Sequence, residues 1–433
     1  MKAILLLAGR SRRFWPLAEK SLFPVCGKTL AEHQVETLKK GGCKEIILVV
    51  GAHNKKEIRG LFPDFTLVEQ KDLHLGMQGA CLSALPKVKK EPVMIVSGND
   101  VTDSAALSDL IAAAKKPKTA GAILARKVKN YFPGGYLSVK NGRITAIVEK
   151  PGKGEEPSKL VNIVAHVHND PQLLLAALKK VKNHRDDGYE QALSSLFASH
   201  FYRAVPYDGF WQPVKYPWHL LPILEYFLSG LRNPSIHRSA KIHHTAVIEG
   251  NVIIGEGTRV LPHATIVGPC VIGRNCVIGT NALVRRSSIG DDCVVGYASE
   301  VKGSVLAGPL WTHMTYLGDS VIGRNVSFGG GSTTGNLRLD EGKISSMDGA
   351  TSVSTSLTKL GIIVGDNCRF GLQSSCYPGI KVGRGSFVSD AALLRQDVPD
   401  GSYVNVKDGI VHVRPNKTTV PPNAAREWYR KTI

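Results

Sequence analysis

Residues 267–279 read V-G-P-C-V-I-G-R-N-C-V-I-G, and this stretch decides the fold of the second half of the chain. An aliphatic or aromatic residue followed at once by glycine recurs there with a period of about six residues. The same pairing returns at Ile254-Gly255, Ile289-Gly290, Val295-Gly296, Ile322-Gly323, Phe328-Gly329, Val364-Gly365, Phe370-Gly371 and Val382-Gly383. Each hexad supplies one strand and one turn, and three hexads close one triangular coil. The period predicts a left-handed parallel β-helix of hexapeptide repeats.

Two segments interrupt this period, residues 307–319 and residues 333–361. In a stacked solenoid, insertions leave the coil as loops on one side, where a site can be built. We therefore expect His313 and Tyr316 to lie in a loop outside the repeat. An imidazole titrates near neutral pH, so it is suited to take a proton from a group that attacks a thioester.

The first half alternates short apolar runs with helical patterns. Strands are predicted at residues 3–7, 45–50 and 93–96, with helices at residues 30–40, 77–85 and 218–228. This rhythm is typical of an α/β domain with a Rossmann-like, mostly parallel sheet. Asn141-Gly142 predicts a two-residue hairpin turn. We place the domain limits at 1–228 for the α/β domain, 229–412 for the β-helix and 413–433 for a basic C-terminal tail.

Composition narrows the class of partner. The chain has 433 residues, a formal net charge of +19 and eight cysteines without a C-x-x-C pair. This charge favours anionic partners such as nucleotides, sugar phosphates and coenzyme A, and the scattered basic residues give no reason to expect nucleic acid. No apolar stretch approaches the ~18 residues of a membrane span. We expect a cytoplasmic protein with reduced thiols.

A basic loop follows the first predicted strand. It reads G-R-S-R-R over residues 9–13, then P-L at 16–17 and K-S-L-F-P-V at 20–25. Backbone N–H groups there, with Arg13 and Lys20, are suited to cradle a triphosphate. The loop resembles the signature of sugar-1-phosphate nucleotidyltransferases, G-x-G-[ST]-R followed by P-L and P-K-x-x-x-P-V. In that family a sugar phosphate oxygen attacks the α-phosphorus of a nucleoside triphosphate, and pyrophosphate leaves.

The resemblance implies a role for each matching residue. Arg13 and Lys20 would hold phosphates as catalytic residues, and Asp100 would hold Mg²⁺. Nucleotide binding falls to Gly9, Gln70 and Gly76, and sugar binding to Gly135, Glu149 and Asn162.

The chain also departs from the nucleotidyltransferase pattern. Ser11 and Arg12 replace the second glycine and the hydroxyl residue of the loop, and Met77 replaces a threonine. Pro213 stands where the family has a second magnesium carboxylate. Asp208 is near in sequence, but its place before Gly209 is typical of a turn. These departures leave open whether the site is active.

The segment W-T-H-M-T-Y-L-G-D at residues 311–319 resembles the acetyltransferase half of the bifunctional N-acetylglucosamine-1-phosphate uridylyltransferase family, whose motif is H-[LM]-[ST]-Y-L-G-D. That match implies His313 as the general base. It implies sugar-phosphate contacts from Arg285 (or Arg286), Lys302, Tyr316 and Asn336. The residues after Asn336 are closer to the archaeal-type branch. The resemblance further implies acetyl-CoA as co-substrate and a homotrimer.

Our main hypothesis is a bifunctional enzyme. It would acetylate an aminosugar 1-phosphate and transfer a nucleotidyl group from UTP or dTTP to the product. One alternative is an acetyltransferase with a degenerate nucleotidyltransferase-like domain. A second alternative is a nucleotidyltransferase whose β-helix serves for oligomerisation alone. The sequence does not distinguish these alternatives, nor does it identify the nucleotide or the hexosamine.

Overall fold

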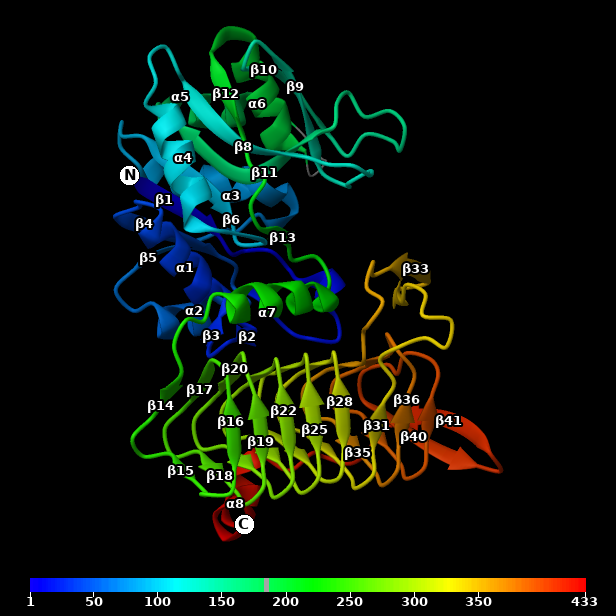
Figure 1. Ribbon diagram of the computed structural model, residues 1–433. Coiled ribbons are helices and arrows are strands. Elements are labelled where there is room, and N and C mark those ends of the chain that lie inside the picture. The colour runs from blue at the N-terminus through cyan, green and yellow to red at the C-terminus, as the bar shows by residue number, and fades with distance from the viewer. Residues whose placement is uncertain (183–186) are drawn as a thin grey trace. The chain divides into compact units, whose positions relative to one another are not determined.

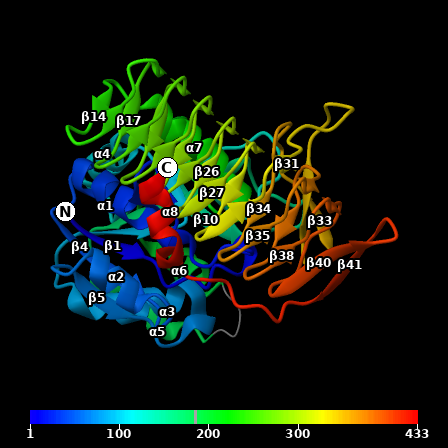
Figure 2. The same ribbon diagram turned by 90° about the horizontal axis from the view of Figure 1, so that it is seen from below.

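The computed structural model describes residues 1–182 and 187–433 (Figure 1, Figure 2). The chain forms two compact units, Met1–Arg10 with Leu30–Pro213 and Ser11–Thr29 with Val214–Ile433. We call them the N-terminal unit and the β-helix unit. The predicted fold class, an α/β nucleotidyltransferase fold followed by a hexapeptide β-helix, is confirmed. Among the described residues, no helix is both long and apolar enough to cross a membrane.

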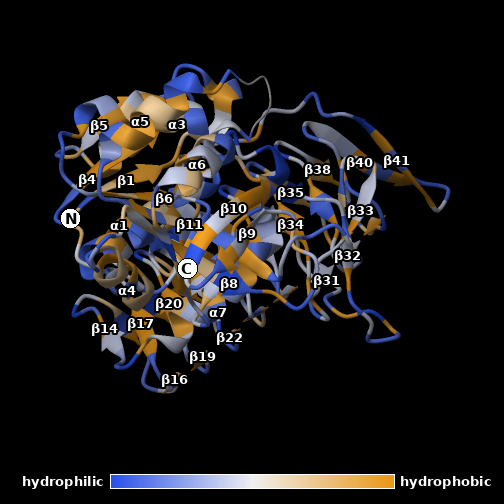
Figure 3. Cartoon of the chain, turned by 90° about the horizontal axis from the view of Figure 1, so that it is seen from above, coloured by the Kyte–Doolittle hydropathy of each residue, from blue (hydrophilic) through white to orange (hydrophobic). Residues whose placement is uncertain are grey.

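The N-terminal unit is built on one large sheet. Its strand order is β5 (Thr66–Glu69), β4 (Glu45–Val50), β1 (Lys2–Leu6), β6 (Val93–Ser97), β11 (Leu160–His168), β8 (Gly121–Lys127), β12 (Tyr202–Pro206), β10 (Arg143–Glu149) and β9 (Gly135–Lys140). The run from β5 to β6 is parallel, and β11 is antiparallel to both of its neighbours β6 and β8. Ala3, Ile4 and Leu5 of β1 are fully buried, and Figure 3 shows this strand in the hydrophobic colour.

The helices of this unit are α1 (Leu30–Lys40), α2 (Lys55–Leu61), α3 (Gly76–Ala84), α4 (Ser104–Ala114), α5 (Pro171–Lys180) and α6 (Gly188–Ser199). Helix α1 forms where predicted, because Leu30, Val35 and Leu38 fall on one face at helical spacing and are buried. The predicted hairpin turn is also confirmed. Asn141 and Gly142 have φ values of 50° and 73°, which a type I′ turn between β9 and β10 requires.

Three sheets form the faces of the β-helix, and their strands are parallel except for the last pair of the second sheet, β40 with β41. The first face contains β14 (Ser235–Ile236), β17 (Val252–Ile254), β20 (Cys270–Ile272), β23 (Ser288–Ile289), β26 (Val305–Leu306), β29 (Val321–Ile322), β34 (Ile363–Val364) and β37 (Lys381–Val382). The second contains β15 (Lys241–Ile242), β18 (Arg259–Val260), β21 (Val277–Ile278), β24 (Val294–Val295), β27 (Leu310–Thr312), β30 (Val326–Phe328), β35 (Arg369–Phe370), β38 (Phe387–Val388), β40 (Ser402–Lys407) and β41 (Ile410–Pro415). The third contains β16 (Val247–Glu249), β19 (Thr265–Val267), β22 (Leu283–Arg285), β25 (Glu300–Lys302), β28 (Tyr316–Gly318), β31 (Thr333–Thr334), β36 (Ser375–Cys376) and β39 (Leu393–Leu394).

The early coils have the length that three hexads give. Ser235 pairs with Ile253, 18 positions further along the chain, and the third-face strands lie side by side in Figure 1. Inward-pointing residues such as Val260, Ile278 and Val295 are fully buried and stack from coil to coil. This stack is the core of the unit.

The prediction that residues 307–319 leave the coil is wrong. Strands β27 and β28 lie within this stretch and pair in register with the coil before them, Trp311 with Val294 and Tyr316 with Glu300. The latter pair is 16 positions apart, so this coil has lost residues at its turns and carries no insertion. His313 therefore lies at the tight corner between β27 and β28.

The second predicted interruption, residues 333–361, is confirmed except at its start, since Thr333 and Thr334 form strand β31 of the coil. Ser327 pairs with Arg369, 42 positions further on, because residues 335–361 leave the coil after β31. This insertion contains an antiparallel hairpin of β32 (Ser345–Asp348) and β33 (Thr351–Ser354), which we call the insertion hairpin.

After β41 the chain runs back along the second face. Arg369 donates to the Pro421 carbonyl at 3.3 Å, Arg426 lies 5.8 Å from the centre of the Trp311 ring, and Arg430 pairs with Asp292. Helix α8 (Glu427–Thr432) therefore lies against the coils, where Figure 2 shows it.

Candidate functional site

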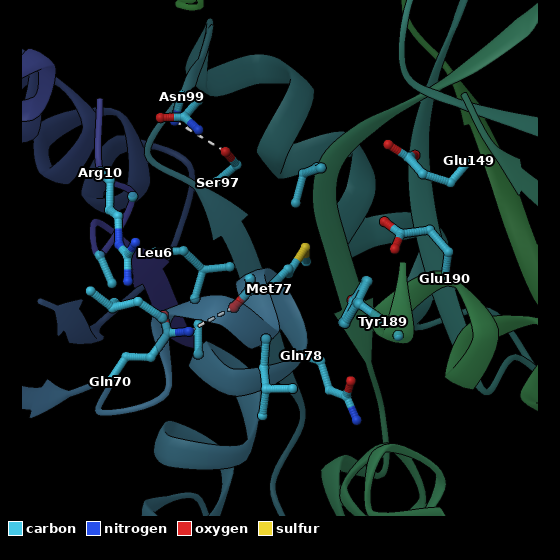
Figure 4. Close-up of a pocket in the computed structure, with 18 of the residues that line it drawn as sticks. Leu6, Arg10, Gln70, Met77, Gln78, Ser97, Asn99, Glu149, Tyr189 and Glu190 are labelled. Carbon is cyan, nitrogen blue, oxygen red and sulfur yellow. Dashed lines mark hydrogen bonds between the residues drawn. The ribbon is translucent and has the colours of Figure 1, made fainter. Parts of the chain in front are cut away.

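The N-terminal unit contains a cavity of about 290 Å³ beside the ends of β1 and β6. Parallel α/β sheets bind ligands outside the carboxyl ends of their strands. Four residues predicted from the sequence line this cavity: Gly9, Gln70, Gly76 and Glu149. Figure 4 shows Arg10 and Gln70 on one wall and Glu149 and Glu190 on the opposite wall.

The hydrogen bonds of Gln70 fix its orientation. Its Nε2 donates to the carbonyls of Asp72 at 3.1 Å and Gly76 at 2.8 Å, the second of which is dashed in Figure 4. Gly79 allows α3 to come this close, since a Cβ there would lie 2.7 Å from Nε2. Both amide hydrogens are therefore used by the protein, and the carbonyl oxygen of Gln70 is left to accept from a ligand.

Glu149 closes the other side of the cavity at the end of β10. Its Oε1 forms an ion pair with Lys150 Nζ at 2.8 Å, and a Cβ on Gly135 would lie 3.1 Å from its Oε2. Gly135 thus leaves room for the carboxylate of Glu149. Tyr189 and Glu190 also line the cavity, although no sequence motif identified them.

Asn162 is 7 % exposed and heads a buried chain of hydrogen bonds. Its Oδ1 can only accept, so His166 Nε2 donates to it at 2.6 Å and His166 Nδ1 accepts from the Tyr189 hydroxyl at 2.8 Å. His168 then bonds Tyr189 at 3.2 Å and Tyr202 at 3.0 Å. These hydrogen bonds connect Asn162 to Tyr189, which lines the cavity.

Burial keeps both imidazoles neutral. It lowers the pKa of His168 to about 3 and holds the pKa of His166 well below its usual value, and protonation of one imidazole would further oppose protonation of the other. In the unfolded chain both would titrate at about 6.5. Below that pH the unfolded state therefore binds protons that the folded state does not.

We expect acid to destabilise the N-terminal unit for this reason. Its free energy of unfolding should fall as the pH drops from ~6.5 towards the folded-state pKa values, by up to about 1.4 kcal/mol per pH unit for each histidine. Urea unfolding at pH 7 and pH 5 measures this slope. It should be smaller in His168→Gln and unchanged in His200→Gln, whose imidazole is on the surface bonded to Ser199. A wild-type slope equal to that of His168→Gln would contradict the assignment.

Asp100 is not among the residues that line the cavity, whereas its neighbour Asn99 is. Its Oδ1 accepts from Trp211 Nε1 at 2.7 Å, within β7 (Asp100–Thr102) paired to β13 (Trp211–Pro213). Pro213 is the register partner of Asp100, so the ladder itself places a proline beside this carboxylate. Within residues 1–182 and 187–433, no three His, Cys, Asp or Glu side chains group so as to hold a metal.

Arg13 and Lys20 belong to the β-helix unit. The Arg13 guanidinium lies 5.9 Å from the centre of the Tyr216 ring, and Lys20 Nζ donates to the Val214 carbonyl at 3.4 Å. Both residues are thus held by the segment that leads into α7 (Leu220–Ser229).

Three predicted residues, Lys302, Tyr316 and Asn336, converge on the outer side of the third β-helix face. Lys302 Nζ lies 3.0 Å from Asp319, and Asn336 Nδ2 donates to Asp319 at 2.6 Å and to the Tyr316 hydroxyl at 3.1 Å. Asp319 thus centres the cluster, a role that the sequence analysis did not assign although it quoted the residue. A Cβ on Gly318 would lie 2.6 Å from Asn336 Nδ2, so glycine leaves space for the cluster.

Arg285 extends this cluster along the ladder. It is the register partner of Lys302 and forms an ion pair with Glu300. Each predicted phosphate-binding cation is therefore matched by a carboxylate. A phosphate would have to compete with Glu300 and Asp319 for these two cations.

His313 is exposed at the corner that precedes β28. Its backbone N–H donates to Thr315 Oγ1 at 3.3 Å, and the Thr315 hydroxyl donates to its carbonyl at 3.0 Å. The imidazole lies 6.4 Å from the Tyr297 ring, centre to centre. The corner is therefore held by backbone and threonine bonds, and the imidazole is exposed.

Comparison with known proteins places these features in a family. The chain is 30 % identical over 421 residues to the bifunctional protein GlmU of Methanococcus maripaludis, covering 95 % of this chain and 98 % of that protein. The chain belongs to the GlmU family. A bifunctional sugar-1-phosphate nucleotidylyltransferase/acetyltransferase of Sulfurisphaera tokodaii is 28 % identical over 416 residues, covering 94 % of this chain and 100 % of that protein.

Family models agree with this division of the GlmU-type chain. Nucleotidyl transferase matches residues 2–214, GMPPB C-terminal domain matches 231–333, and Hexapeptide repeat of succinyl-transferase matches 361–389. The protein is thus an enzyme that joins a nucleotidyltransferase to a hexapeptide-repeat acetyltransferase, as the sequence predicts. Nucleotidyltransferases of this family act on a nucleoside triphosphate and a sugar phosphate.

Proposed function

We propose that this enzyme acetylates an aminosugar 1-phosphate with acetyl-CoA on its β-helix. It then transfers a nucleotidyl group from UTP or dTTP to the N-acetylhexosamine 1-phosphate. The main support is that the predicted residues gather in two places, Gly9, Gln70 and Glu149 around one cavity and Lys302 and Asn336 in one cluster. In this proposal residues 1–228 carry nucleotidyl transfer, 229–412 carry acetyl transfer and 413–433 form the tail.

The orientation of Gln70 fits the UTP or dTTP of this proposal. Its carbonyl oxygen would accept from a donor on the base, and uracil and thymine each present an N–H at N3, as the other bases present amino or ring N–H groups. Gly9 and Gly76 would leave room for the base and ribose beside it. Across the cavity, Glu149 would accept from sugar hydroxyls, with Gly135 and Asn162 completing the sugar subsite.

Phosphate handling is proposed for Arg13, Lys20 and Asp100. Transfer at phosphorus depends on positioning and charge neutralisation, so two cations suit the triphosphate. Mg²⁺ commonly binds through one or two carboxylates together with substrate phosphates and water. Asp100 supplies one carboxylate, and its neighbour Pro213 has no side-chain ligand to add. Such a site suits an ion that is held largely by substrate phosphates and water better than an ion that is held by protein ligands alone. Mg²⁺, when held by Asp100, would neutralise charge on the phosphates.

For acetyl transfer we propose His313 as the general base. The aminosugar nitrogen attacks the thioester carbonyl, an N–C bond forms and the C–S bond breaks. His313 takes the proton from the nitrogen and passes it to the departing sulfur, so that coenzyme A leaves as the thiol and the imidazole is again neutral. Arg285, Lys302 and Tyr316 would bind the sugar phosphate, and Asn336 would hydrogen-bond the sugar. A homotrimer and a cytoplasmic location complete the proposal.

Two assays on the wild-type protein test the proposal. The first follows thiol release from acetyl-CoA with glucosamine 1-phosphate or galactosamine 1-phosphate. The second follows Mg²⁺-dependent pyrophosphate release from UTP or dTTP with the N-acetylated sugar phosphate. We expect turnover in both. Thiol release alone would show that the N-terminal domain is degenerate, and pyrophosphate release alone would show that the β-helix is a scaffold.

A further inference from the structure

The loop Ser11–Thr29, which we call the nucleotide loop, is anchored on the β-helix. Trp15 Nε1 donates to Asp400 Oδ1 at 2.9 Å, and Lys381 Nζ lies 4.9 Å from the centre of the Trp15 ring. Further along the loop, the backbone N–H of Cys26 donates to Ser288 Oγ at 2.7 Å. The loop is thus bound to the β-helix at both ends of its length.

Lys381 connects this loop to the insertion hairpin. The residue is 4 % exposed, forms an ion pair with Asp397 at 3.4 Å and donates to the Met347 carbonyl of the hairpin. A buried ammonium is costly unless its donors are satisfied, so these partners hold it in place. One side chain therefore contacts the coil, the hairpin and the nucleotide loop at once.

A second contact from the same hairpin reaches the neighbourhood of Arg13. The Tyr216 hydroxyl donates to Asp348 Oδ2 at 3.1 Å, and the Tyr216 ring stacks on Trp218 with centres 4.4 Å apart. Burial raises the pKa of Tyr216, and its bond to Asp348 raises it further, so the phenol stays protonated and keeps donating. The ring that Arg13 approaches at 5.9 Å is thereby fixed.

The insertion hairpin has no role in the hexapeptide repeat, which continues in register on either side of it. Its base is nevertheless firmly attached. Ser346 donates to the Gly379 carbonyl at 2.8 Å, and Ile344 is 2 % exposed. The two residues at the end of β32 are those that contact the loop and its support, Met347 through Lys381 and Asp348 through Tyr216.

We propose that Asp348 is a positioning residue for nucleotidyl transfer, acting through Tyr216 on Arg13, and that Lys381 fixes the same loop through Trp15. Nucleotidyl transfer then depends on an element inserted in the acetyltransferase half. This inference rests on the proposed role of Arg13. Asp348 itself touches no substrate.

A double-mutant cycle on Tyr216 and Asp348 tests the proposal. Tyr216→Phe and Asp348→Ala should each lower kcat for nucleotidyl transfer by about 10- to 100-fold, since a displacement of about 1 Å in a catalytic group has effects of this size. The double variant should be no slower than either single variant, because both remove one hydrogen bond. Asp348→Asn keeps an acceptor and should restore most of the rate.

Acetyl transfer and melting temperature should stay at wild-type values in all these variants. Asp340→Ala is the matched control, because this carboxylate lies in the same insertion and pairs with the neighbouring side chain of Arg338. It should leave nucleotidyl transfer unchanged. Additive losses in the double variant, or equal losses of both activities, would overturn the positioning role.

Hydrogen exchange separates this inference from the proposed function. Asp348→Ala should speed amide exchange in the nucleotide loop and at residues 216–218 while leaving β4 unchanged, whether or not the protein makes a nucleotide sugar. If the wild-type protein shows no nucleotidyl transfer while Asp348→Ala still shows faster exchange than the wild type, the proposed function is refuted and the anchoring of the loop stands. Unchanged exchange in Asp348→Ala and in Lys381→Met would refute the anchoring itself.

Discussion

Replacing His313 by alanine is expected to lower kcat for acetyl transfer by about 10²- to 10⁴-fold, the range typical for loss of a general base. The substitution removes an exposed imidazole from a corner whose hydrogen bonds come from the backbone and Thr315. The imidazole is exposed and is not part of the stacked core of the coils. Melting temperature and acetyl-CoA affinity should therefore stay near the wild-type values.

A matched control for this experiment is His263→Ala. His263 occupies a corner of an earlier coil, where its backbone N–H is likewise bonded to a threonine, Thr245, at 3.1 Å. Its removal should leave acetyl transfer unchanged. Acetylation at the wild-type rate in His313→Ala, or collapse of its fold, would refute the role of His313 as the base.

Asp100→Asn is expected to lower nucleotidyl transfer by about 10²- to 10³-fold while acetyl transfer continues. The substitution removes negative charge where we propose that Mg²⁺ meets the triphosphate, and groups that stabilise phosphoryl transfer have effects of this order. Asparagine can still accept from Trp211, so the pairing of β7 with β13 should persist. Pyrophosphate release at several Mg²⁺ concentrations measures the loss.

Asp208→Asn is the companion variant, since Asp208 is exposed and close in sequence to Pro213. It should behave as wild type. If Asp208→Asn loses activity and Asp100→Asn keeps it, the metal site has been assigned to the wrong carboxylate. Rescue of Asp100→Asn by high Mg²⁺ would support weakened metal binding over a damaged fold.

Sequence alone predicted the architecture well because both halves repeat a simple pattern. Helix α1 and strand β4 have the predicted bounds, and the hairpin turn at Asn141-Gly142 follows from local backbone preference. The error at residues 307–319 has a physical reason. A coil that loses residues at its turns breaks the hexad period just as an insertion does, and only the strand pairing distinguishes the two cases.

The candidate sites were predictable where a short motif carries the chemistry. Gly9, Gln70, Gly76 and Glu149 come from separate segments, yet they line one cavity. Tyr189 and Glu190 line the same cavity from α6, but no sequence motif marks them. Their position in the cavity depends on how helix α6 packs against the sheet. The bond between Trp15 and Asp400 joins residues 385 positions apart, and nothing local in the sequence encodes it.

The returning C-terminal segment changes how the β-helix should unfold. In a solenoid each coil contacts only its neighbours, so coils can fray one at a time from either end. Here Arg430 pairs with Asp292 in an early coil, while the Pro421 carbonyl accepts from Arg369 several coils later. The C-terminal segment thus spans the intervening coils and contacts the coils at both ends of this stretch. This long-range constraint favours cooperative unfolding of these coils over unfolding one coil at a time.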